Sequence, residues 1–127
     1  MNLKKIIISG LILLAIDAVY LSIIGEDYGK MIKRIQGKDM KLNTVGAVLC
    51  YVIMTLGLNY FILNEKTKNM NDLYLRAFIL GLLVYGVYET TSYALLENWD
   101  VKYVLVDTVW GGTLFALTTF FVFKLNL

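Results

Sequence analysis

The feature that most constrains this chain is a set of four apolar runs, each long enough to cross a lipid bilayer. The runs cover residues 6–24, 43–63, 75–96 and 103–123. At a rise of about 1.5 Å per residue, ~20 residues of helix match the ~30 Å hydrocarbon core. Lipid cannot hydrogen-bond to the backbone, so runs of this length are predicted to be helices. We therefore predict an all-α fold, with residues 1–127 forming one integral membrane four-helix bundle with short loops.

The composition of the chain also indicates lipid as its solvent. Hydrophobic residues make up 58% of the 127 residues, against about 45–50% in an ordinary soluble domain. The formal net charge of +2 is too small and too scattered for binding to nucleic acid. Cys50 stands alone in the sequence, so it offers neither a disulfide nor a metal cluster. Neither a nucleic acid partner nor a cofactor is predicted.

The longest connection between apolar runs, residues 25–42, carries an amphipathic stretch. Within it, Tyr28–Ile35 places its apolar side chains on one stripe and most of its basic side chains off that stripe. This pattern predicts a short interfacial helix that lies on the bilayer surface. Trp99 and Tyr103 flank the third connection and are predicted to be interface anchors at headgroup depth.

The orientation of the chain in the membrane is weakly encoded. Four crossings place both termini on one side, and Lys and Arg residues divide equally between the two sides, so the positive-inside rule decides nothing. Lys4 and Lys5 precede the first run, which favours cytoplasmic termini. Richness in Ile, Lys and Asn is typical of an AT-rich genome. The predicted location is a multi-pass position in a bacterial inner membrane or in a viral or host-derived membrane.

Three of the four runs each contain one carboxylate, namely Asp17, Glu89 or Asp107, and no Lys, Arg or His lies in their interior. A carboxylate near the bilayer centre costs about 2.5–3.5 kcal/mol, so three of them require a reason. Asp17 and Glu89 each lie seven residues before the end of their run, which is ~10 Å deep. Asp107 lies four residues after the start of its run, which is ~6 Å deep. The connectivity therefore predicts one acidic layer in the membrane half away from the termini.

Aromatic side chains accompany each carboxylate on its own helix face. Tyr and Trp can donate a hydrogen bond to a carboxylate while most of their surface stays apolar. We therefore expect the three acids to act as ligands and the aromatic side chains to shape the pocket. The residues predicted to bind a cation or another ligand are Asp17, Glu89, Asp107, Tyr20, Tyr85, Tyr88 and Trp110.

Motifs in the first, third and fourth runs form a pattern that extends over essentially the whole chain. They are Asp17 followed by Tyr20, Leu21 and Tyr28; the segment Tyr85–Ala94, which reads YGVYETTSYA; Trp99; and Asp107 followed by Trp110 and Gly111. With these motifs the chain resembles a small family of bacterial and viral membrane proteins known as domain of unknown function 2177. The resemblance implies a fold and a set of positions, and it implies no reaction.

Three positions depart from the pattern of that family. Glu89 stands where Asp is expected, Ser92 where Asn is expected, and Tyr20 where Trp is expected. Glutamate keeps the charge of aspartate but adds one methylene group, which changes the reach of the carboxylate.

Three interpretations of the acidic layer remain open at this point. In the first, the layer binds a small cation or a proton as part of a transport cycle. The four-helix architecture of the small multidrug transporters, which work as dimers, is an analogy for such a homo-oligomer. In the second, hydroxyl and carboxyl groups form a structural knot, and the protein is a component of a larger membrane or capsid assembly that docks through residues 25–42. The third and least favoured is a membrane enzyme that uses paired carboxylates and a divalent metal.

Overall fold

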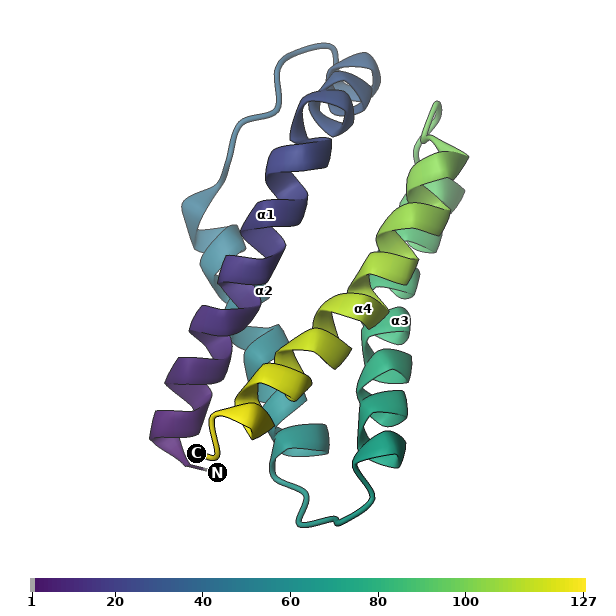
Figure 1. Cartoon of the computed structure of the whole chain (residues 1–127). Coiled ribbons are helices and arrows are strands. Elements are labelled where there is room, and N and C mark those ends of the chain that lie inside the picture. The colour runs from purple at the N-terminus through teal and green to yellow at the C-terminus, as the bar shows by residue number, and fades with distance from the viewer. Residues whose placement is uncertain (1) are drawn as a thin grey trace.

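The computed structural model describes residues 2–127, and these residues form four long helices and no strand. Figure 1 shows the helices side by side, with both chain ends at the same end of the molecule. This confirms the predicted all-α four-helix architecture. The helices are α1 (Leu3–Gln36), α2 (Thr44–Leu58), which continues into the π-helical turn η1 (Asn59–Leu63), α3 (Met70–Leu95) and α4 (Val101–Lys124).

Each helix begins at a residue whose side chain satisfies the first free backbone N–H groups. Asn2, Asn43, Asn69 and Asp100 occupy the N-cap positions of α1, α2, α3 and α4, and each side-chain oxygen accepts a hydrogen bond from a backbone N–H group in the first turn. Such caps fix the start of a helix. The end of α1 is set by Gly37, whose φ of 81° lies in the left-handed region that glycine adopts without steric cost.

The outer surface of the helices is apolar along most of its length. All four helices are long and apolar enough to cross a membrane, and at most 39% of the residues in any of the four candidate spans are buried inside the protein. On α2, for example, Val45, Leu49 and Ile53 are all exposed. A surface of this kind would be unstable in water, and lipid covers it without cost. The structure therefore supports an integral, multi-pass membrane protein.

Helix α1 is much longer than the first apolar run. Its 34 residues correspond to ~51 Å, which exceeds the ~30 Å hydrocarbon core. The residues predicted to form a separate interfacial helix, Tyr28–Ile35, are instead the last part of α1. Gly25 and Gly29 do not interrupt the helix, because a glycine in a helix interior costs only ~1 kcal/mol. The predicted docking segment, residues 25–42, is thus mostly helix, and its Met31 is fully buried.

Two separate apolar cores hold the helices together. The main core joins all four helices and includes Leu13, Leu58, Leu73 and Phe115. The second core lies where the last part of α1 meets the α3–α4 connection, and its buried members are Met31, Trp99 and Tyr103. The apolar stripe of Tyr28–Ile35 therefore packs against protein, because α1 continues past the membrane run and reaches this connection.

Helices α3 and α4 form the closest pair because glycines remove side chains from their interface. A Cβ atom added at Gly81 would lie only 2.1 Å from the carbonyl oxygen of Gly111, and one added at Gly111 would lie 2.4 Å from the ring of Tyr85. Backbones approach this closely only where both helices present small residues. The pair forms a rigid support for Glu89 and Asp107, one on each helix.

We expect Gly81→Ala to destabilise the protein by about 1–3 kcal/mol, because the added methyl group overpacks the α3–α4 interface. The control is Gly57→Ala, since a Cβ atom at Gly57 meets no other atom within 4 Å. That change should leave stability unchanged or raise it by up to ~1 kcal/mol through helix propensity. Thermal unfolding in detergent compares the two variants, and equal midpoints would show that the close approach does not matter.

Candidate functional site

The three membrane carboxyl groups all lie in the interior of the protein. Asp17 on α1 is 4% exposed, Glu89 on α3 is 0% exposed and Asp107 on α4 is 8% exposed. None of them faces the lipid side of its helix. These three residues, called the acid layer below, are brought together from segments that lie up to 90 positions apart in the chain. A buried carboxyl group requires hydrogen-bond donors, so its partners determine what the layer can do.

The carboxyl group of Asp17 receives one donor at each oxygen. The Tyr51 hydroxyl on α2 donates to Oδ2 at 2.5 Å, and the Trp110 indole N–H on α4 donates to Oδ1 at 2.9 Å. Both donors carry large apolar bodies that suit a membrane interior. Asp17 thereby joins three helices at one point, without any charged partner.

A stacked aromatic pair separates Asp17 from Asp107. The rings of Tyr20 and Trp110 lie 4.5 Å apart with an angle of 10° between their planes. Trp110 donates to Asp17 on one side of the pair, while the Tyr20 hydroxyl donates to Asp107 at 3.0 Å on the other. The stack therefore fixes both carboxyl groups at a set separation.

The carboxyl groups of Glu89 and Asp107 are neighbours in the acid layer. Two carboxyl groups can hydrogen-bond to each other only when one of them carries a proton, since ionised carboxylates are acceptors only. Glu89 has two further partners: the Trp99 indole N–H donates to Oε1 at 3.0 Å, and the Tyr28 hydroxyl donates to Oε2 at 3.5 Å. Glu89 is thus a buried carboxyl group beside Asp107, with donors from α1 and from the α3–α4 connection.

Two hydroxyl groups extend the contacts of Glu89 to the outer surface of α3. The Tyr28 hydroxyl lies 3.4 Å from the Tyr88 hydroxyl, and Tyr88 is 53% exposed. Tyrosine hydroxyls both donate and accept hydrogen bonds. The polar path therefore runs from Tyr88 through Tyr28 to Glu89 and Asp107, and ends at Tyr20.

The structure places the four predicted aromatic site residues in three kinds of position. Tyr20 and Trp110 touch the carboxyl groups of the acid layer directly, as described above. Tyr88 reaches the layer indirectly, through its hydroxyl contact with Tyr28 and its edge-on packing against Trp99. Tyr85 is half-buried and packs against Gly111, and it makes no side-chain hydrogen bond to a carboxyl group in residues 2–127.

Three donors to the acid layer were not predicted as site residues. They are Tyr28, Tyr51 and Trp99. The prediction that Trp99 and Tyr103 are interface anchors is wrong, because both side chains are buried, at 5% and 3% exposure. Tyr28 and Trp99 were present in the family motifs. The signal for Tyr51 was its place on a polar stripe of the second run, where it is followed at intervals of four by Thr55 and Asn59.

A second buried polar cluster lies nearer the termini. The Asn59 side-chain amide, in the π-helical turn η1, donates to the Ser9 hydroxyl at 2.9 Å and to the Thr55 carbonyl at 2.8 Å. Leu13, which is fully buried, lies one turn from Ser9 and one turn from Asp17 on α1. This apolar side chain interrupts the polar stripe of α1 between the Asn59 cluster and the acid layer.

Within residues 2–127, no group of three or more His, Cys, Asp and Glu side chains is placed to hold a metal ion. The carboxyl oxygens of Asp17 and Glu89 already face N–H or O–H donors, whose hydrogens point at the position a cation would need.

The comparison with family models agrees with the fold. A model described as "Predicted membrane protein (DUF2177)" matches residues 2–124, which confirms the family resemblance seen in the motifs. No curated protein and no solved structure matches the chain.

We expect Tyr51→Phe to destabilise the protein by about 1–3 kcal/mol, because the change removes a donor from the buried Asp17 carboxyl group while the ring remains. Tyr60→Phe on the same segment is the matched control, since Tyr60 is 64% exposed, and its effect should be near zero. Chemical denaturation in mixed micelles measures both. If the two variants have the same stability, the donor to Asp17 contributes nothing.

Proposed function

The chain belongs to the DUF2177 family of membrane proteins, and from its buried acid layer we propose that it binds protons within the membrane for a proton-coupled transport step. In this proposal Glu89 and Asp107 form the proton-binding pair. Tyr28 and Tyr88 exchange protons between that pair and the water on the side opposite the termini.

The observation that carries this proposal is the unbroken sequence of titratable or hydroxyl side chains from Tyr88 to Asp107. The Tyr88 and Tyr28 hydroxyls lie 3.4 Å apart, and the Tyr28 hydroxyl donates to Glu89 at 3.5 Å. The carboxyl group of Asp107 is the next neighbour of Glu89. Protons move along such chains by exchange between neighbouring groups, and intramembrane carboxyl groups commonly serve as relays. The neighbouring carboxyl groups of Glu89 and Asp107 support a pair that holds one proton between them in this proposal.

Asp17 has a different role in this proposal, because the Trp110 indole is a donor only and cannot relay a proton. Asp17 orients the stacked pair of Tyr20 and Trp110, which in turn orients Asp107. Asp17 accepts a proton only if a side chain in the layer rotates. Because the Trp110 indole separates Asp17 from Glu89 and Asp107, protons would stay on Glu89 and Asp107 until such a movement occurs.

A structural role is the second candidate, and one observation favours it. The carboxyl group of Asp17 accepts hydrogen bonds from two other helices, and that of Glu89 accepts from α1 and from the α3–α4 connection. A knot of this kind would hold the bundle in shape, as a component of a larger membrane assembly requires. In that role the layer would need its hydrogen bonds but not its titratable protons.

We expect Glu89→Gln and Asp107→Asn to reduce proton flux by more than about tenfold in proteoliposomes, because an amide cannot take up and release the relayed proton. Flux is followed with a pH-sensitive dye enclosed in the vesicles and driven by a membrane potential. Glu97→Gln is the control, since Glu97 is exposed at the α3–α4 connection.

The same variants separate the two candidate functions. Amides keep the shape and one acceptor oxygen of each carboxyl group, so a purely structural layer would tolerate them with a change in thermal stability alone. Two outcomes would contradict the proton-binding role and favour the structural one. In the first, the wild-type protein gives the same proton flux as empty vesicles; in the second, the variants give the same flux as the wild type.

A further inference from the structure

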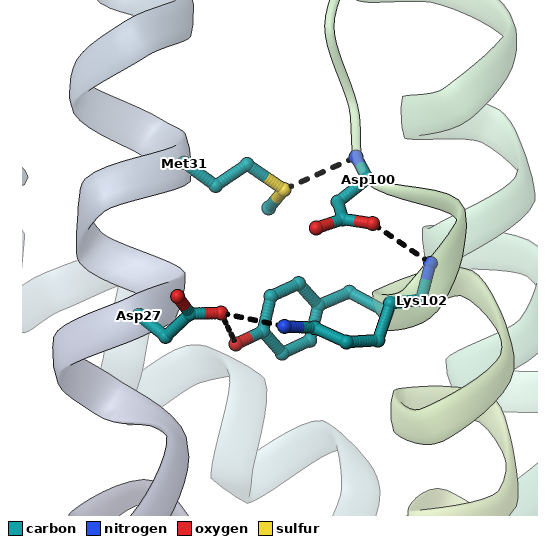
Figure 2. Close-up of polar contacts among 5 residues, drawn as sticks. Asp27, Met31, Asp100 and Lys102 are labelled. Carbon is teal, nitrogen blue, oxygen red and sulfur yellow. Dashed lines mark hydrogen bonds and ion pairs between the residues drawn. The ribbon is translucent and has the colours of Figure 1, made fainter.

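Three residues join the extended end of α1 to the start of α4. The Asp27 carboxylate on α1 accepts hydrogen bonds at the same oxygen from the Lys102 ammonium group, at 2.8 Å, and from the Tyr103 hydroxyl, at 2.5 Å. Figure 2 shows Asp27 on one helix facing Lys102 on the other. We call Asp27, Lys102 and Tyr103 the clasp. It links segments 75 and 76 positions apart in the chain.

A second contact fixes the same two segments one helical turn further along α1. The Asp100 backbone N–H donates to the sulfur of Met31 at 3.3 Å, and the Asp100 carboxylate accepts from the Lys102 backbone N–H at 2.9 Å (Figure 2). Met31 is fully buried at this point. The end of α1 therefore rests on the capping turn of α4.

The clasp is linked to Glu89 through Tyr28. The Tyr103 ring packs edge-on against the Tyr28 ring, with centroids 5.0 Å apart, and the Tyr28 hydroxyl contacts Glu89. Glu89 is only six residues from the end of α3, a depth of ~9 Å, yet it has no exposed surface. Tyr28 and Trp99 both donate to Glu89 and pack edge-on against each other. They form the aromatic cover over Glu89, and the clasp holds its Tyr28 side in place through Tyr103.

The polar part of the clasp is in contact with water. The side chains of Lys102 and Asp27 are 55% and 57% exposed. Ion pairs this exposed hold weakly, because water and salt compete for both charges. The clasp therefore favours the arrangement in which Glu89 is covered, but only by a small free energy, so that it can open.

We propose that the clasp is a gate that controls the access of water and protons to Glu89 from the side opposite the termini. With the clasp closed, Tyr103 and Tyr28 cover Glu89. With the clasp open, the end of α1 moves away from α4 and Glu89 meets water. The inference that protons pass the gate rests on the proposed function. The inference that Glu89 is covered rests on the contacts described here.

The test measures how fast Glu89 reacts in the full-length protein in lipid nanodiscs. A water-soluble carbodiimide with an amine nucleophile modifies carboxyl groups that water reaches, and mass spectrometry of the peptides gives the rate at each residue. We expect Asp27→Asn to raise the rate at Glu89 by about twofold to fivefold, the change in open population that an exposed ion pair can command. Tyr103→Phe, which keeps the ring, should act in the same direction.

A charge exchange and a control variant make the result specific. Asp27→Lys combined with Lys102→Asp restores the ion pair in reverse and should return the rate toward that of the wild type. Glu26→Gln removes the neighbouring pair of Glu26 with Lys30, which lies within α1 and joins no other helix, so it should leave the rate unchanged.

The outcomes distinguish this gate from the proton-binding role. An unchanged rate at Glu89 in Asp27→Asn overturns the gate, and so does an equal rise at Asp17, which would indicate general loosening. In both cases the proton-flux result for Glu89→Gln stands independently. A specific rise at Glu89 that the charge exchange reverses supports the gate, even if no variant conducts protons and the proposed function fails.

Discussion

Hydrogen bonding of buried carboxyl groups is the constraint on which this structure depends. Asp17 and Glu89 cannot be solvated by lipid, and each is satisfied by donors from other segments of the chain. All four of these donors are Tyr or Trp, whose rings add apolar contact area around each polar bond. Removing one donor leaves a buried acceptor unpaired, which costs more than the bond itself contributes. The carboxyl groups therefore restrict how the helices can be arranged, whatever else they do.

The helices divide the tasks of holding the acid layer and of covering it. The close contact of α3 with α4, through Gly81 and Gly111, fixes Glu89 against Asp107. Helix α1 supplies Asp17 and Tyr20 within the membrane and, because it extends beyond the membrane run, it also supplies Tyr28 as a cover. In the gate proposed above, the cover over Glu89 is held weakly. The access of water to Glu89 can then change while Glu89 and Asp107 keep their positions.

Much of the candidate site followed from residue type and connectivity. Tyr20 and Trp110 were predicted as neighbours of the acids and do donate to them. Trp99 was predicted to lie at the membrane interface because tryptophan is common at that depth. In the structure it packs against the last part of α1 and donates to Glu89 instead. Tyr51 was passed over because its own run holds no carboxylate, and its partner lies 34 positions away.

The sequence by itself determined that the chain crosses a membrane with four helices and that three acids lie within them. Run length, apolar composition and the cost of charge in lipid are local properties, and they need no knowledge of contacts between helices. Tertiary structure alone decided which donor serves each carboxyl group, that Glu89 and Asp107 are neighbours, and that α1 continues to Gln36 and brings Tyr28 to Glu89. Those features depend on the rotation and separation of helices, which interhelical contacts fix and which helical periodicity in one segment does not specify.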